Sequence, residues 1–120
     1  MMSASTPWDA LGARTAATAE YTLMDGFTTV RDAGGMNGKG VKKMIDSGEL
    51  PGPRVFPSGG FLGSTSSHSD FKLLTMRNPR LNGSLDSNLA RLEIGFVVDG
   101  RADVLAAARR NFQMGATQLK

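Results

Sequence analysis

The sequence has no cysteine and a single histidine, His68, among its 120 residues. Without cysteine the chain can form neither a disulfide framework nor a zinc site built from thiolates. A single imidazole also excludes, for this chain alone, every metal site that needs two histidines. These absences leave a globular protein whose chemistry must come from other residue types or from other parts of a larger protein.

Long apolar runs and clustered charges are missing as well. No stretch approaches the roughly 18 apolar residues of a membrane-spanning helix, and the N-terminus lacks the basic and apolar regions of a signal peptide. The 14 Lys and Arg residues exceed the 11 Asp and Glu residues by three, and these charges are scattered rather than gathered in one patch. We therefore expect neither a membrane nor a nucleic-acid partner. The absence of a signal peptide favours a cytoplasmic location, although the compartment stays open if the natural N-terminus lies further upstream.

The sequence is rich in glycine, with 15 residues, and these glycines separate helix-like from strand-like segments. Capping residues, apolar spacing and β-branched runs predict six elements along the chain. They are a helix over Trp8–Met24, a strand over Phe27–Val30, a helix over Val41–Ser47, a strand over Arg54–Phe56, a helix from Asp99 to just before Gly115, and a strand over Ala116–Lys120. Between about residues 58 and 98 the pattern fails, which predicts a long loop of a kind that is commonly functional.

Helices that alternate with short strands predict an α/β fold with a parallel sheet and helical crossovers. Three strands would leave open sheet edges, and no helix follows the last of them. We therefore expect part of a larger array, such as a (β/α)₈ TIM-type barrel, which needs about 250 residues. A small three-layer domain that is complete in itself is the alternative.

In parallel α/β folds, ligands gather at the carboxyl ends of the strands. Here those ends carry Arg31 and Asp32, the loop that leads to His68, and Lys120. Each residue also has a purely structural explanation. Asp32 could cap a turn through an Asx bond, Arg31 could pair with a scaffold carboxylate, and His68 and Lys120 could simply be exposed. No phosphate-binding loop, dinucleotide fingerprint or nucleophile elbow is present, so these patterns identify no enzyme class.

Longer strings are more informative. The string Gly26–Gly35 resembles the second barrel strand and following loop of metal-dependent amidohydrolases, in the imidazolonepropionase-like and Xaa-Pro dipeptidase-like group. Ser64–Phe71 is similar to the Gln-Thr-Gly-Gly-His-Gly-Asp-Phe loop of that group. Further similar strings follow in the same order as in the family, at Gly52–Gly59, Val98–Arg109 and Gly115–Lys120.

The resemblance implies that residues 1–120 are an incomplete amidohydrolase barrel segment, covering strands two to four of the barrel with their helices. It implies a hydrolase of amide or peptide C–N bonds, with one or two divalent metal ions, expected to be zinc. Lys120 matches the family lysine that can be carboxylated and then bridges two metals. His68 matches a loop histidine near the substrate, and Arg31 and Asp32 would lie close to it, so all three are substrate-binding candidates.

The sequence also departs from the family. The first-strand histidine pair and the later histidine and aspartate ligands are absent, and one ligand cannot hold a catalytic metal. Ser67 and Ser69 replace loop glycines, which puts the conformation of the loop in question. We therefore expect a small amide or peptide substrate for the complete enzyme, which could be oligomeric, and no metal binding or catalysis by this chain alone. A non-catalytic binding or interaction module is the alternative.

Overall fold

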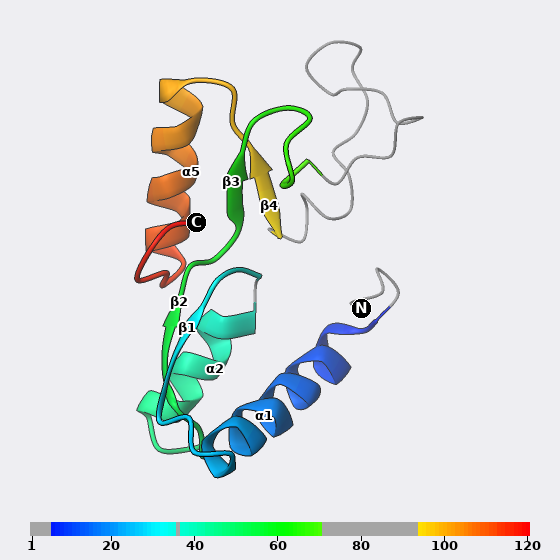
Figure 1. Ribbon diagram of the computed structural model, residues 1–120, viewed down its shortest axis with the longest axis vertical. Coiled ribbons are helices and arrows are strands. Elements are labelled where there is room, and N and C mark those ends of the chain that lie inside the picture. Colours follow the sequence, from blue (N-terminus) through cyan, green and yellow to red (C-terminus); the bar gives the residue numbers. More distant parts are fainter. Residues whose placement is uncertain (1–5, 36, 71–93) are drawn as a thin grey trace.

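The computed structural model describes residues 6–35, 37–70 and 94–120. The elements along these residues are α1 (Trp8–Met24), β1 (Thr29–Asp32), α2 (Asn37–Asp46), β2 (Arg54–Pro57), β3 (Phe61–Gly63), β4 (Gly95–Val97) and α5 (Arg101–Gln113), as Figure 1 shows. Among these helices, none is both long and apolar enough to cross a lipid bilayer.

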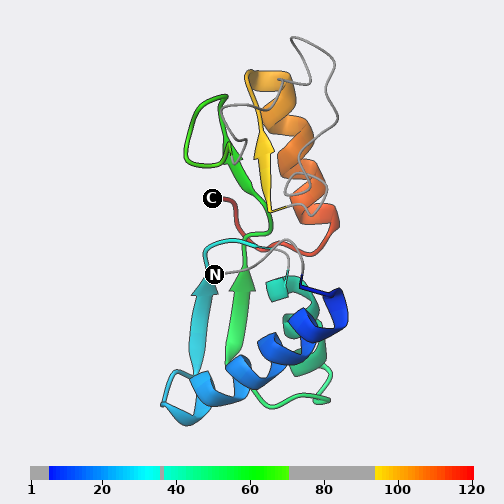
Figure 2. The same ribbon diagram turned by 90° about the vertical axis from the view of Figure 1, so that its right-hand side faces the viewer.

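The first sheet is formed by β1 and β2, which run parallel, with α2 as the crossover between them. The register places Val30 opposite Val55 and Asp32 opposite Pro57. Val55 is buried, as is Ala19 of α1, and α1 and α2 pack together on the same side of the strands (Figure 2). Arg31 and Phe56 belong to the opposite face and are exposed. The predicted α/β class with parallel pairing is thereby confirmed for this part of the chain.

A second small sheet is formed by β3 and β4, which also run parallel, with Leu62 opposite Phe96. The helix α5 lies beside β3 (Figure 1). Both strands fall within the predicted loop over 58–98, so that prediction was wrong at both ends of the range. The strands were missed because each has three residues and begins or ends with glycine. Residues 71–93 of the predicted loop lie outside the described residues.

Other element boundaries differ from the predictions. The helix α1 has the predicted bounds, whereas β1 begins two residues later than expected, at Thr29. The helix α2 begins at Asn37 rather than Val41, so Gly38 and Gly40 belong to the helix. The predicted strand over Ala116–Lys120 is an irregular segment instead.

Several helix faces expose apolar side chains among the described residues. Ala19 of α1 is buried, whereas Trp8 of the same helix is 52% exposed. Apolar side chains along α5 are likewise exposed, and further exposed side chains lie around the end of α1. The large apolar residues concerned are Tyr21, Met24, Phe27, Val104, Leu105 and Phe112. Such surfaces are typical of faces that another part of a protein covers.

Candidate functional site

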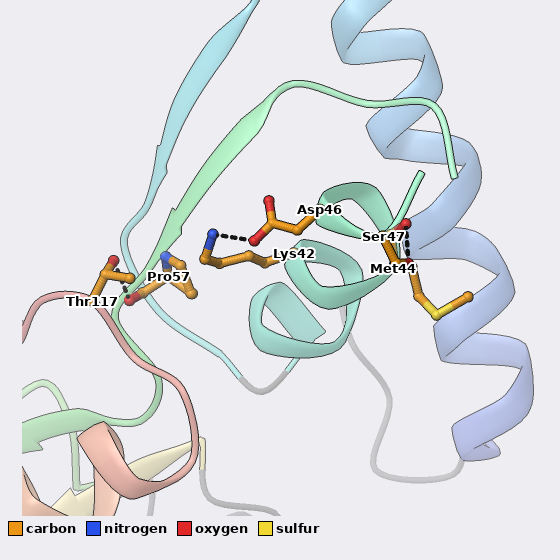
Figure 3. A network of polar contacts seen from close by, with 6 residues as sticks. All are labelled: Lys42, Met44, Asp46, Ser47, Pro57 and Thr117. Atoms are coloured by element: carbon orange, nitrogen blue, oxygen red, sulfur yellow. Dashed lines mark hydrogen bonds and ion pairs between the residues drawn. The ribbon is translucent and has the colours of Figure 1, made fainter. Parts of the chain in front are cut away.

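The C-terminal segment crosses the junction between the two sheets. The Thr117 backbone N–H donates to the Pro57 carbonyl over 2.8 Å, and the Thr117 hydroxyl donates to the same oxygen over 3.3 Å (Figure 3). Further along, the Leu62 N–H donates to the Lys120 carbonyl over 2.8 Å. These bonds bring Lys120 to the carboxyl end of β2 and the start of β3.

Two of the predicted site residues meet at the aromatic ring of Phe61. The Lys120 ammonium lies 4.5 Å from the centroid of this ring, a cation–π contact. The His68 ring is a second neighbour of Phe61, with 6.5 Å between the ring centroids and a tilt of 47° between the ring planes. The ring also packs directly on Gly34, where a β-carbon would overlap it. Phe61 therefore joins His68 and Lys120 to the loop that follows β1.

Arg31 is held at the same end of the sheet by Gln118. Its Nε donates to Gln118 Oε1, and Gln118 Nε2 donates to the Phe56 carbonyl over 2.9 Å and to the Asp32 carbonyl over 3.3 Å. Sequence reasoning missed Gln118 and Phe61. No local pattern could have identified Gln118, because its partners lie 62 to 87 residues away.

Asp32 takes a different position from the other predicted site residues. Because side chains alternate along a strand, its carboxyl group lies on the helix-facing side, opposite to Arg31. Its Oδ1 accepts the Gly34 N–H over 3.2 Å, which is the Asx turn that the sequence allowed. Its Oδ2 lies against Gly38 in the first turn of α2. Burial raises the pKa of Asp32, and the bond from Gly34 partly offsets this rise.

Asp32 also lines a cavity of about 290 Å³ between α1, β1 and α2. The remaining wall includes a row of hydroxyl groups on α1, from Thr15, Thr18 and Thr22. Each of these hydroxyls donates to a carbonyl one turn earlier in its own helix. Asp32 therefore has the surroundings of a turn-capping residue. It does not belong to the cluster of side chains around Phe61.

Replacing Asp32 with asparagine tests whether burial raises the pKa of this carboxyl group, through the pH dependence of stability. A carboxyl group whose pKa is raised in the folded state binds more protons in the folded than in the unfolded protein. Its contribution to folding stability is therefore complete below the ordinary pKa of 3.8. That stability is lost as the pH rises through the pKa of the folded state. Asparagine keeps the acceptor for Gly34 and does not titrate. We expect D32N to gain stability relative to the wild type as the pH rises from 4 to 7, measured by urea unfolding. A difference that is constant with pH would contradict the raised pKa.

The loop that carries His68 is fixed by polar contacts at its base. The Thr65 N–H donates to Asp99 Oδ1 over 2.7 Å, and the Ser66 N–H donates to Asp70 Oδ2 over 2.9 Å. Ser66 takes the positive φ, 64°, and no other non-glycine residue of the described ranges does so. Serine in place of the family glycines at Ser67 and Ser69 is therefore compatible with the loop, and His68 itself is exposed.

Lys120 is the one candidate metal ligand that the resemblance assigns to this chain. Among the described residues there is no group of three or more His, Asp or Glu side chains that could hold a metal ion. A single ligand cannot hold a catalytic metal, so a site that included Lys120 would need further ligands. What the arrangement offers is a cationic and aromatic cluster at the carboxyl ends of parallel strands.

No protein-family model matches the chain, and no curated protein matches it either. Solved structures do match. A crystal structure of a prolidase complexed with N-methylphosphonate-L-proline is 34% identical, with a TM-score of 0.75 over 98% of this chain and 28% of that one. A crystal structure of an amidohydrolase is 36% identical, with a TM-score of 0.75 over 97% of this chain and 28% of that one.

A third structure, of an Xaa-Pro dipeptidase with methionine bound in its active site, is 26% identical, with a TM-score of 0.72. That match covers 97% of this chain and 27% of the dipeptidase. The chain thus spans little more than a quarter of the length of the structures that it matches. The resemblance stated from the sequence strings is confirmed, and the chain is a relative of the amidohydrolases of the prolidase and Xaa-Pro dipeptidase type.

Proposed function

We propose that this chain is a segment of a metal-dependent hydrolase that cleaves amide or peptide C–N bonds. Residues 1–120 would form strands two to four of a (β/α)₈ barrel with their helices. The parallel β1–α2–β2 unit supports this proposal, because its polar groups gather at the carboxyl ends of the strands, where such barrels bind ligands. The similarity to an amidohydrolase and a prolidase over nearly the whole chain supports it as well.

The observation that carries the proposal is the meeting of His68 and Lys120 at the Phe61 ring. These two residues match a substrate-contacting histidine and a carboxylatable lysine of the family, and they come from loops 52 residues apart in the sequence. Carboxylation would turn Lys120 into an anionic oxygen ligand for a divalent metal such as zinc. Such a metal, when bound, activates water and polarises the scissile carbonyl. Its other ligands would have to come from outside the described residues.

The proposed substrate is a small dipeptide or related amide with a free carboxylate. Two similar structures hold small ligands with an amino-acid carboxylate, N-methylphosphonate-L-proline in one and methionine in the other. A carboxylated Lys120 would be anionic and would not attract a substrate carboxylate. Among the candidate site residues, the Arg31 guanidinium is then the cation that would bind this carboxylate. His68 would contact the substrate from the loop after β3. Asp32 is the weaker of the substrate-binding candidates, because it caps the turn at Gly34.

The test is hydrolysis of Xaa-Pro dipeptides by the intact protein that contains this chain, supplied with zinc and bicarbonate. We expect metal-dependent turnover by the intact protein and none by the 120-residue chain, since Lys120 is its one candidate ligand. Two results would contradict the proposal: no hydrolysis of any amide by the intact protein, or metal-dependent turnover that copurifies with the short chain.

A non-catalytic binding module is the second candidate. The exposed apolar side chains at the end of α1 and along α5 favour it, because a partner could cover them. This function predicts that the chain, free of metal, is monodisperse and unfolds in one cooperative thermal transition. Aggregation without a cooperative transition would instead favour the barrel segment, whose faces need the remainder of the barrel.

A further inference from the structure

Gln118 uses the polar atoms of its side chain to join three segments of the chain. Its Oε1 accepts from Arg31 Nε, and its amide nitrogen donates to the carbonyls of Asp32 and Phe56, at the ends of β1 and β2. A primary amide has one acceptor oxygen and two N–H donors. All of these are used, so the orientation of the amide is determined by its partners.

This arrangement also restricts Arg31. The guanidinium group is bound through Nε, at the side nearest its own chain. Among the described residues, the contacts of Arg31 leave its two terminal nitrogens for another partner. Those nitrogens form the planar edge that binds a carboxylate through two parallel hydrogen bonds. Arg31 and Phe56 are opposite one another in the register, on the exposed face of the sheet.

We infer that Gln118 is a positioning residue, which holds the Arg31 guanidinium across the ends of β1 and β2 so that its terminal nitrogens receive the substrate carboxylate. The identity of the ligand, a substrate carboxylate, rests on the proposed function. The contact between Gln118 and Arg31 does not depend on that function. Gln118 lies two residues before Lys120 and in the segment that Thr117 fixes to Pro57. The same short segment therefore sets the position of both Arg31 and Lys120.

The first test is independent of catalysis. Methionine matches glutamine in shape and has no amide, so Q118M removes the three hydrogen bonds with little change in volume. The readout is the exchange rate of the Arg31 Nε–H with water in the intact protein, by NMR, with the resonance assigned from its loss in R31K. We expect exchange at least about fivefold faster in Q118M, as for an N–H that loses its protection. The matched control is Q113M on the exposed end of α5, which should leave the rate unchanged. An unchanged rate in Q118M overturns the inference.

The second test separates positioning from general structural support. A Xaa-Pro dipeptide and its C-terminal amide differ in the carboxylate alone. For the intact, zinc-loaded protein we expect Q118M to lower kcat/KM about tenfold for the acid, mainly through KM, as for losing one hydrogen bond that supports a charged contact. The amide should be unaffected.

An equal loss on both substrates would overturn the positioning role. If the wild-type protein hydrolyses neither substrate while the Arg31 exchange rate still rises in Q118M, the proposed function is wrong. The substrate role of Gln118 is then wrong with it, although the contact is real. Faster exchange together with a loss confined to the acid supports both.

Discussion

If the proposed function holds, replacing Lys120 with alanine is expected to lower kcat/KM of the intact protein at least about a hundredfold, an effect larger than that of removing an outer-shell partner of a metal ligand. The reason is that the proposed carboxylated lysine would supply anionic oxygens to the metal, and alanine supplies none. The measurement is hydrolysis of an Xaa-Pro dipeptide at saturating zinc and bicarbonate, with metal content determined on the same sample. We expect the zinc content to fall along with the activity.

Lys120→Arg distinguishes a metal-ligand role from a simple charge role. Arginine keeps a cation above the Phe61 ring, where Lys120 lies now. It stays protonated at all accessible pH values and cannot capture CO₂ as a neutral amine can. We therefore expect K120R to be as inactive as K120A. The control is Lys43→Ala on the exposed side of α2, which should retain full activity. Substantial activity in K120R would show that Lys120 acts as a cation and would sink the carboxylated-ligand assignment.

How far the sequence predicts the fold depends on whether an element is specified locally. The helix α1 was predicted with its observed bounds because its start at Pro7 and its stop at Asp25–Gly26 are local signals. The strands β3 and β4 were missed because their partners lie more than thirty residues apart. The start of α2 was missed because Gly38 normally signals a loop. Glycine fits there because a β-carbon would meet the end of the Asp32 carboxyl group, which would have to move.

The candidate site shows the same division. Arg31, His68 and Lys120 could be found because they follow strands or match family strings, and the structure brings His68 and Lys120 to one aromatic ring. Phe61 and Gln118, which hold these residues, carry no signal of their own. A phenylalanine near glycines and a glutamine near the C-terminus have many uses, and their roles arise from contacts between distant segments. Resemblance identifies candidate site residues, whereas the residues that contact and hold them become visible in three dimensions.

Asn111 joins α5 to the segment that leads into β3. Its side chain is 1% exposed. The Oδ1 accepts the Gly60 N–H over 3.0 Å, and Nδ2 donates to the Gly60 carbonyl over 2.9 Å. The amide therefore imitates a strand partner for the residue just before β3. Gly59 makes room for it, with φ of +72° and no space for a β-carbon beside Asn111 Oδ1.

Asn111→Leu is expected to destabilise the intact protein by about 3 kcal/mol, because it leaves both backbone groups of Gly60 buried without partners at a cost of ~1–3 kcal/mol each. Leucine has the same branching and the same number of side-chain heavy atoms, so the substitution leaves no cavity and the loss reports the hydrogen bonds. The measurement is urea unfolding followed by circular dichroism, with the midpoint compared at constant slope. Gln113→Leu, on the exposed end of the same helix, controls for helix propensity and should change stability by less than about 0.5 kcal/mol. If N111L matches Q113L, the amide of Asn111 does not hold Gly60, and the segment leading into β3 must be fixed by the Thr117 and Lys120 backbone contacts instead.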